Sequence, residues 1–191
     1  MTPLVFATNN QHKLEEVQAL TVDKFHLKTL REIGCLEEIP ETGSTFRENA
    51  SQKSHFIFDR YGLSCFADDS GLEIDALNGE PGVYSARYSG SRDSQKNLWL
   101  VLEKMKGVEH RKARFRCVIS LILDGNEFFF EGTTEGTITT EPFGEGGFGY
   151  DPIFIPDGYP STFAEMPADE KNKISHRGLA VAELVSFLNN Y

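Results

Sequence analysis

Residues 115–134 have the sequence FRCVISLILDGNEFFFEGTT, which is the strongest fold signal in the chain. Two runs rich in β-branched and aromatic residues, 115–123 and 127–134, flank the polar stretch at 124–126. An Asp-Gly pair between such runs favours the tight turn of a β-hairpin, because glycine accepts a positive φ at no steric cost. The stretch therefore predicts two long antiparallel strands, with residues 136–140 as a candidate further strand.

Strands and helices alternate in the part of the chain before this hairpin. Residues 4–8 form an apolar run, and residues 13–20 repeat apolar side chains at helical spacing. A second helix is expected between Thr45, which has capping-box spacing to Glu48, and Gly62. This alternation is typical of a chain that builds a sheet with helices packed against it.

The rest of the chain adds strands, turns and two further helices. The expected elements are strands at 64–68, 72–77 and 153–155, turns at 69–71 and 78–82, a glycine-rich loop at 142–151, and helices at 98–105 and 179–188. Helices alternate with strands early and strands cluster later. The pattern predicts a mixed α/β fold with an elongated central sheet flanked by helices.

Length and composition suit a single folding unit. The 191 residues are enough to bury a sizeable core, so one domain is expected over 1–191. No signal peptide or membrane-length apolar run is found, which predicts a cytoplasmic protein with no membrane partner. Cys35, Cys65 and Cys117 form no CxxC pair and are expected to be reduced, buried thiols without a chemical role.

The charge balance limits the kinds of partner. A formal net charge of -10 argues against a protein that follows the phosphates of a nucleic-acid polymer, because such proteins need clustered Lys and Arg. A small phosphorylated ligand is still allowed, since a few well-placed cations can hold it. The acidic excess also suits a site that collects divalent cations.

Polar residues occupy the expected transition from the first strand to the first helix. They are Thr8, Asn9, Asn10, Gln11, His12 and Lys13. Free backbone amides and the positive end of the helix dipole at such a junction attract an anion, and the lysine adds a mobile positive charge. The same residues also suit an ordinary polar connection with an N-cap. The segment lacks the GxxxxGK[ST] pattern, so it is not a P-loop.

Two adjacent carboxylates, Asp68 and Asp69, follow the apolar residues 65–67. Burying both is costly unless a cation joins them, so metal binding is one interpretation and an Asx-type turn is the other. Side chains alternate along a strand, so only one of the pair easily points to a given site. We choose Asp69, which is nearer the expected turn. Glu41 offers a second carboxylate on a loop, although a lone glutamate there is ordinarily just solvated.

Later segments add candidate ligand-binding residues, each with an ordinary structural alternative. Lys53 lies on the apolar stripe of the second helix, where it must either reach water or meet an anion in a cleft. Residues 144–149 let backbone approach a ligand beside aromatic stacking surfaces, or else form a flexible loop. Lys171 and residues 175–178 group donors suited to a phosphate or a base edge, or to surface charge before the last helix.

Together these segments resemble the inosine triphosphate pyrophosphatase family, also called the non-canonical purine nucleoside triphosphate pyrophosphatases. The resemblance extends from Phe6 to Gly178, and several motifs occur in the family's order. The matching stretches are ATNN at 7–10 with Lys13, ETG at 41–43, ENA at 48–50, ADDSGL at 67–72, PGVYSAR at 81–87, GGFGYDP at 146–152 and ISHRG at 174–178.

The resemblance implies Mg²⁺-dependent cleavage of a purine nucleoside triphosphate to the monophosphate and pyrophosphate, by a homodimer with a cleft between two lobes. It implies that Glu41 and Asp69 hold the metal and that Asp69 is the base for the attacking water. Residues 8–13 and Lys53 would hold the triphosphate, with Ser70 beside the substrate. The residues implied to contact the base, the sugar and nearby polar groups are Phe148, Gly149, Tyr150, Asp151, Lys171, His176 and Arg177.

Donor chemistry predicts which bases such a pocket accepts. Arg177 can only donate hydrogen bonds and His176 can donate as well, so a pocket built from them suits the 6-oxo group of inosine and xanthosine. The amino group of adenosine would face another donor, and adenosine triphosphate should be rejected.

Other functions fit parts of the same pattern. A nucleotide-binding sensor without turnover could use the same cleft, but it has no need for a base at Asp69. A Nudix-type pyrophosphatase is disfavoured because no RExxEE helix is present. The net charge disfavours a metal-dependent nuclease.

Overall fold

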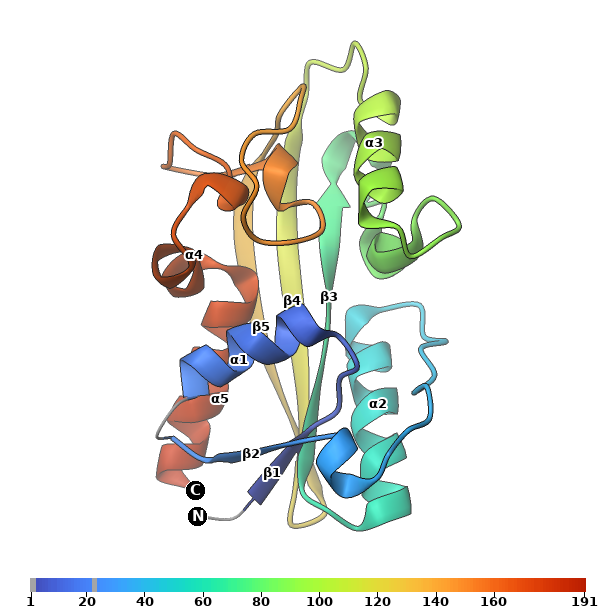
Figure 1. The fold of residues 1–191 in the computed structure, drawn as a ribbon, viewed down its shortest axis with the longest axis vertical. Helices are drawn as coiled ribbons and strands as arrows, with labels where there is room; N and C mark the ends of the chain where they lie inside the picture. The colour runs from blue at the N-terminus through green and yellow to red at the C-terminus, as the bar shows by residue number, and fades with distance from the viewer. Residues whose placement is uncertain (1–2, 22–23) are drawn as a thin grey trace. The chain divides into compact units, whose positions relative to one another are not determined.

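A computed structural model of the chain describes residues 3–21 and 24–191 and contains a sheet with helices beside it (Figure 1). The strands are β1 (Pro3–Phe6), β2 (His26–Thr29), β3 (Cys65–Ile74), β4 (Lys112–Leu123), β5 (Asn126–Ile138) and β6 (Phe154–Pro156). The α-helices are α1 (Gln11–Thr21), α2 (Phe46–Tyr61), α3 (Ser94–Lys104), α4 (Ala168–Ile174) and α5 (His176–Asn190). Short 3-10 helices are η1 (Arg31–Ile33), η2 (Asp75–Leu77), η3 (Gly82–Arg87), η4 (Asp151–Ile153) and η5 (Phe163–Glu165).

The strands form one mixed sheet in the order β2-β1-β3-β4-β5-β6 within the described residues. β1 pairs in parallel with β2 and β3, and β5 pairs antiparallel with β6. Asp124 and Gly125 have φ angles of 50° and 79° at the turn between β4 and β5, as a tight hairpin turn requires. The predicted hairpin and the predicted mixed α/β class with flanking helices are confirmed.

Helix α2 has both of its predicted ends. The Thr45 side chain accepts a hydrogen bond from the amide of Glu48, and Gly62 ends the helix in the left-handed conformation with φ 63°. These contacts satisfy amide and carbonyl groups that the helix itself leaves unpaired. These fixed ends define the positions of Asn49 and Lys53 along the helix.

The predicted turn at 69–71 is wrong, because β3 continues through it as one strand from Cys65 to Ile74. Asp68 pairs with Lys13 and Arg177 through its Oδ2, and Asp69 accepts a hydrogen bond from Asn49, so these contacts take the place of those that a turn would supply. Residues 136–138 likewise prolong β5 and form no separate strand.

Two further elements, β2 and α4, were not expected from the sequence. Neither repeats apolar side chains at a regular spacing. Each is short: β2 has four residues, none of them fully buried, and α4 has seven. The last helix also begins at His176, earlier than the predicted residue 179.

The chain divides into two compact units. Unit 1 comprises Met1–Asp69, Cys117–Gly132 and Arg177–Tyr191, and unit 2 comprises Ser70–Arg116 and Thr133–His176. The expectations of a single domain and of a cleft between two lobes stay predictions.

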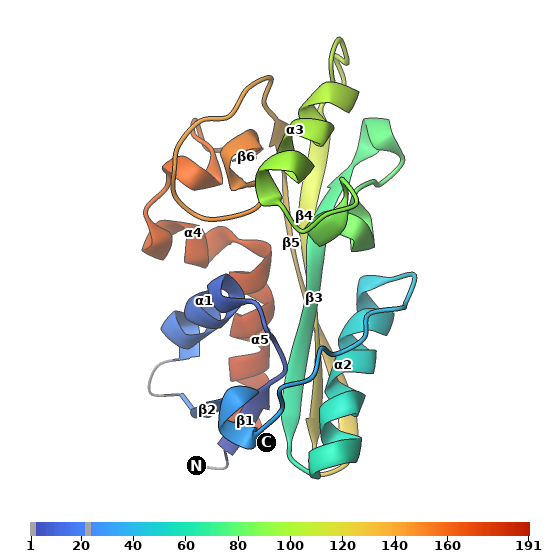
Figure 2. The ribbon, with the colours of Figure 1, turned by 45° about the vertical axis from the view of Figure 1, so that its right-hand side comes forward.

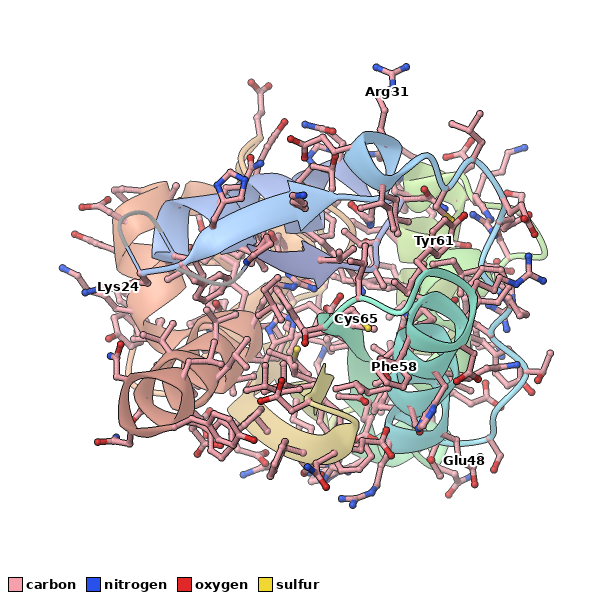
Figure 3. The ribbon with its side chains drawn as sticks, turned by 90° about the horizontal axis from the view of Figure 1, so that it is seen from below. Lys24, Arg31, Glu48, Phe58, Tyr61 and Cys65 are labelled. Atoms are coloured by element: carbon pink, nitrogen blue, oxygen red, sulfur yellow. The ribbon has the colours of Figure 1, made fainter. Side chains whose placement is uncertain are left out.

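Unit 1 has an apolar layer on each face of its strands. Leu4 and Phe6 of β1 belong to the layer that contains residues of α1 and α5, whereas Val5 and Ala7 belong to the layer that contains Ile57 of α2. This division follows from the alternation of side chains along a strand. Figure 3 shows α2, with Phe58 and Tyr61 labelled, next to Cys65 at the start of β3.

Unit 2 has one apolar core. Leu98 and Val101 of α3 pack in the same cluster as Leu72 of β3, Phe115 of β4 and Phe154 of β6. Figure 2 shows α3 beside the strands of this unit. The core holds the loop at 142–151 in place through Tyr150, which is 5% exposed.

Cys35, Cys65 and Cys117 are free and buried, as predicted. Among the described residues, the helices are all too short or too polar to traverse a bilayer.

Candidate active site

The segment 8–13 forms the junction between β1 and α1, as predicted. Asn10 caps the helix, because its Oδ1 accepts a hydrogen bond from the Lys13 amide at 3.2 Å, while its own amide donates to Thr8 Oγ1 at 3.1 Å. Asn9, Gln11 and the other residues from 9 to 12 are exposed. The positive end of the α1 dipole is therefore accessible to an anion.

Asp68 is a buried carboxylate that joins two cations in unit 1. Lys13 Nζ lies 3.0 Å from its Oδ2, and Arg177 Nε lies 3.2 Å from the same oxygen. Arg177 also pairs with Glu16, and its side chain is only 2% exposed. Burial by itself would raise the pKa of Asp68, but Lys13, Arg177 and Lys53 together hold it well below its usual range.

Asp69 makes contacts with different partners. Its Oδ2 accepts a hydrogen bond from Asn49 at 2.9 Å, and its Oδ1 lies 3.9 Å from Lys53 Nζ. Lys53 also pairs with Glu41 and donates to the backbone carbonyl of Asp68 at 2.6 Å. The predicted site residues Glu41, Lys53 and Asp69 are thus brought together in unit 1.

The pKa values of Glu41, Lys53 and Asp69 are shifted by burial and by the charges of their neighbours. Burial raises the pKa of Asp69, which Lys53 and Lys13 oppose and the charge of Glu41 reinforces. Burial would also raise the pKa of Glu41, but Lys53 holds it below its usual value. Burial would lower the pKa of Lys53, but the carboxylates keep it raised. The lysine therefore stays charged between the two carboxylates.

We call the residues joined by these ion pairs the Asp68 cluster: Lys13, Glu16, Glu41, Lys53, Asp68, Asp69 and Arg177. It contains four carboxylates and three cations, so its net charge is -1 when all are ionised. The repulsion between Glu41 and Asp69 would be relieved by a divalent cation, and carboxylate oxygens suit Mg²⁺. Among the described residues no group of three or more His, Cys, Asp or Glu side chains could hold a metal. A pair of carboxylates fits an ion that keeps waters and phosphates as its other ligands.

Unit 2 brings a second set of predicted residues together. Lys171 Nζ lies 2.7 Å from Asp151 Oδ2, and both side chains are buried. The ammonium also lies 5.2 Å from the ring centre of Phe148 and 5.7 Å from that of Phe163. We call these four residues the Lys171 cluster. A planar ring beside a fixed donor suits recognition of a flat, polar base.

Gly147, in the loop that carries Phe148, leaves no room for a side chain. Gly147 has φ 63°, and a Cβ there would lie 2.0 Å from Asp151 Oδ2. That carboxylate oxygen also accepts the amide of Phe148 at 3.0 Å. Any side chain at 147 would therefore displace the partner of Lys171.

The remaining predicted residues have separate surroundings. Tyr150 donates to the carbonyl of Ser85 at 2.6 Å and is buried in unit 2, and Gly149 has φ 61°. Ser70 is partly buried in β3, and His176 stacks on Phe115 with ring centres 4.7 Å apart. His176 belongs to unit 2, whereas Arg177 belongs to unit 1.

Similarity to known proteins identifies the family of this chain. Residues 4–187 match the Ham1 family. The chain belongs to the Ham1 family. It is 54% identical over 190 residues to the dITP/XTP pyrophosphatase of Porphyromonas gingivalis, covering 98% of each chain. It is 47% identical to the dITP/XTP pyrophosphatase of Bacillus subtilis over 193 residues, again covering 98% of each chain.

Solved Ham1 structures are similar to the whole chain. The Ham1 protein of Coxiella burnetii has a TM-score of 0.92 and 40% identity, with complete coverage of both chains. That of Staphylococcus aureus has a TM-score of 0.90 and 40% identity, covering 99% of each chain. The family resemblance inferred from the motifs is confirmed.

Three residues of this Ham1-family chain enter the site without having been predicted. They are Glu16, Asn49 and Asp68, through contacts with Arg177, Asp69 and Lys13 respectively. A signal existed for Asn49, which lies four residues before Lys53 on the same helical face. Asp68 had the same carboxylate signal as Asp69. The partner of Glu16 is 161 residues away, beyond any local pattern.

Proposed function

We propose that this protein hydrolyses the triphosphates of inosine, deoxyinosine and xanthosine to the monophosphate and pyrophosphate, and so removes these non-canonical purines from the nucleotide pool. The observation that carries the proposal is Asp69, a buried carboxylate with a raised pKa that lies with Lys53 and Glu41. Relatives named dITP/XTP pyrophosphatase, 44% to 54% identical over nearly the whole chain, support the substrate class.

Asp69 is proposed as the general base. A carboxylate whose pKa is raised by burial binds a proton more readily than an exposed one, so it can take the proton of the water that attacks the α-phosphorus. The Asn49 hydrogen bond holds one of its oxygens, which fixes the direction of the other. A divalent ion, proposed to be Mg²⁺ held by Glu41 and Asp69, would neutralise charge on the phosphate oxygens.

The triphosphate is proposed to bind at residues 8–13 and Lys53. Backbone amides at the start of α1 are suited to hold an anion, and Lys13 and Lys53 add two positive charges. The ion pair with Asp68 positions the Lys13 ammonium. Catalysis of phosphoryl transfer needs mainly such positioning and charge neutralisation.

The base and sugar are proposed to contact the Lys171 cluster and its neighbours. Phe148 supplies a ring for stacking, and Lys171 supplies a donor for the 6-oxo group. Ser70, Gly149, Tyr150, His176 and Arg177 are proposed to contact the substrate as well.

The test is to incubate the protein with Mg²⁺ and a panel of nucleoside triphosphates and to identify the products. We expect equal amounts of monophosphate and pyrophosphate. Stepwise release of orthophosphate would contradict attack at the α-phosphorus. Tight binding without any product would favour a nucleotide sensor instead.

We further propose that the enzyme is a homodimer and acts in the cytoplasm. The family resemblance supports the dimer, and the three free, buried thiols support a reducing compartment. Sedimentation equilibrium of the purified protein tests the dimer, because a mass equal to one chain at micromolar concentration would contradict it.

A further inference from the structure

Asn49 connects two parts of the proposed metal site. Its side chain, on α2, is 1% exposed. Its Nδ2 donates to Asp69 Oδ2 at 2.9 Å, and its Oδ1 accepts the amide of Gly43 at 2.7 Å. A buried amide with both ends hydrogen-bonded is held in one orientation. Asn49 therefore links the loop that carries Glu41 to the strand that carries Asp69.

The partners leave no choice in the orientation of this amide. A backbone N–H can only donate, so the oxygen of Asn49 must face Gly43, and a carboxylate accepts, so the nitrogen must face Asp69. An aliphatic side chain could make neither contact. An aspartate at 49 would place a second carboxylate against Asp69.

The loop itself is built to fit against α2. Thr42 donates its amide to Gln52 Oε1 at 2.8 Å, and Ser44 donates its amide to Glu48 at 2.7 Å. At Gly43 a Cβ would lie 2.6 Å from Glu48 Cβ and 2.8 Å from Asn49 Oδ1. The absence of a side chain at 43 thus lets the loop reach Asn49.

We propose that Asn49 is a positioning residue that fixes the Asp69 carboxylate relative to Glu41, with Gly43 as the backbone contact that makes this possible. The inference rests on the proposed function, because it assumes that Glu41 and Asp69 share a metal ion. Asn49 touches no reacting atom and acts through Asp69.

The first test compares Asn49→Ala with Gln52→Ala. Both variants remove a side-chain tether of the same loop, but only Asn49 also contacts Asp69. Loss of a residue that orients a metal ligand typically costs about 10- to 100-fold in activity or metal affinity, so we expect that loss in kcat for Asn49→Ala, with KM changed much less. For Gln52→Ala we expect a change of less than about threefold. Equal losses in the two variants would mean that only loop tethering matters and would overturn the proposal.

A double-substitution cycle tests whether Asn49 acts through Asp69. In an Asp69→Asn background, Asn49→Ala should cost little further kcat, because the group that Asn49 positions is already gone. Additive losses would overturn the proposal. If Asp69→Asn alone left kcat unchanged, the proposed function would fail, whatever the cycle shows.

Metal affinity provides a readout that needs no turnover. Mn²⁺ binding to the protein without nucleotide can be followed by the loss of the free-ion electron paramagnetic resonance signal. We expect Kd to rise about 10-fold or more in Asn49→Ala and to stay near wild type in Gln52→Ala. An unchanged Kd in Asn49→Ala would overturn the inference.

Gly43→Ala tests the same contact with Asn49 left intact. Its added Cβ must push the loop or the amide oxygen of Asn49, so the same direction of change in kcat and in Mn²⁺ affinity is expected. A thermal unfolding curve shows whether Asn49→Ala folds. If it does not, Gly43→Ala decides whether the contact between Asn49 and Gly43 positions Asp69. Wild-type kcat and Kd in folded Gly43→Ala would overturn the proposal.

Discussion

The Asp68 cluster in unit 1 and the Lys171 cluster in unit 2 are both buried and charged, but they differ in composition. The Asp68 cluster holds four carboxylates and three cations, and burial and ion pairs shift several of their pKa values in opposite directions. The Lys171 cluster holds one ion pair, whose ammonium lies 5.2 Å and 5.7 Å from the centres of two phenylalanine rings. Many coupled charges suit phosphate chemistry, whereas one fixed donor beside a ring suits selection of a base.

The largest expected effect tests the chemical role of the Asp68 cluster. Asp69→Asn should keep the fold but lose about 10²–10⁴-fold in kcat, because an amide is a poor metal ligand and cannot take the proton of water. The loss should be the same for every triphosphate, since Asp69 is not part of the Lys171 cluster. A variant that kept more than about a tenth of the wild-type rate at saturating Mg²⁺ would exclude Asp69 as the base.

The next effect is on stability. Arg177→Met removes a cation that is 2% exposed and leaves Asp68 and Glu16 without it. Breaking a buried pair in this way costs about 3–5 kcal/mol in the free energy of unfolding, which urea denaturation measures. As a control, Lys112→Met breaks an exposed pair with Glu135 and should cost less than about 1 kcal/mol. Similar costs for the two substitutions would contradict the structural role of Arg177.

Base selection tests the Lys171 cluster. The wild-type kcat/KM for inosine triphosphate should exceed that for adenosine triphosphate by about 10²-fold or more, because the adenine amino group would meet a donor. Lys171→Met should narrow this ratio. Comparing two substrates on one preparation makes the ratio independent of any loss of folded protein. Equal wild-type values would remove the basis for calling the cluster a base pocket.

The ratio of kcat/KM for inosine triphosphate to that for adenosine triphosphate also tests the role of Arg177. The sequence-based prediction is that Arg177 recognises the base, so its substitution should narrow the gap between inosine and adenosine triphosphates. Its contacts in unit 1 include those with Asp68 and Glu16. An unchanged ratio of the two kcat/KM values in Arg177→Met would show that Arg177 does not recognise the base.

The elements that could be predicted are those encoded by neighbouring residues. Helix α2 has its cap and its terminating glycine in the sequence, and the hairpin has its Asp-Gly turn. Two carboxylates after an apolar run indicate a cation, but the preference for Asp69 over Asp68 rests on its nearness to an expected turn that the structure replaces with a continuous strand. The short, partly exposed strand β2 lacks any such local pattern.

The internal contacts of the site could not be predicted, because they join residues far apart in the chain. Asp68 and Arg177 are separated by 109 positions, and Lys53 and Glu41 approach only because α2 packs beside the loop. The expected turn at 69–71 failed for the same reason. Lys13, Arg177 and Asn49, which are remote in the sequence, contact the two carboxylates within a continuous strand.

The smallest effect distinguishes the two neighbouring carboxylates by the sign of their pKa shifts. The pKa of Asp68 is held below its usual range in the folded protein, so on acidification the unfolded chain takes up this proton first. The stabilisation from Asp68 is complete above the unfolded pKa of about 3.9 and is lost as pH falls towards the folded pKa. The pKa of Asp69 is raised, so the folded protein takes up that proton first and acidification favours folding in the corresponding window.

Substitution of Asp68 and substitution of Asp69 should therefore change the pH dependence of the free energy of unfolding in opposite directions at acidic pH. Between about pH 5 and pH 2, the free energy of unfolding should fall less steeply in Asp68→Asn than in wild type, by at most about 1.4 kcal/mol per pH unit. The free energy of unfolding of Asp69→Asn should fall more steeply than that of wild type, because this variant lacks the group that favours folding on acidification. Urea unfolding in metal-free buffer at several pH values gives these slopes, and the carboxylates outside the Asp68 cluster contribute equally to all three proteins. If both substitutions made the slope shallower, the carboxylates would share one electrostatic environment, and the separation of Asp68 as an anchor from Asp69 as a base would be wrong.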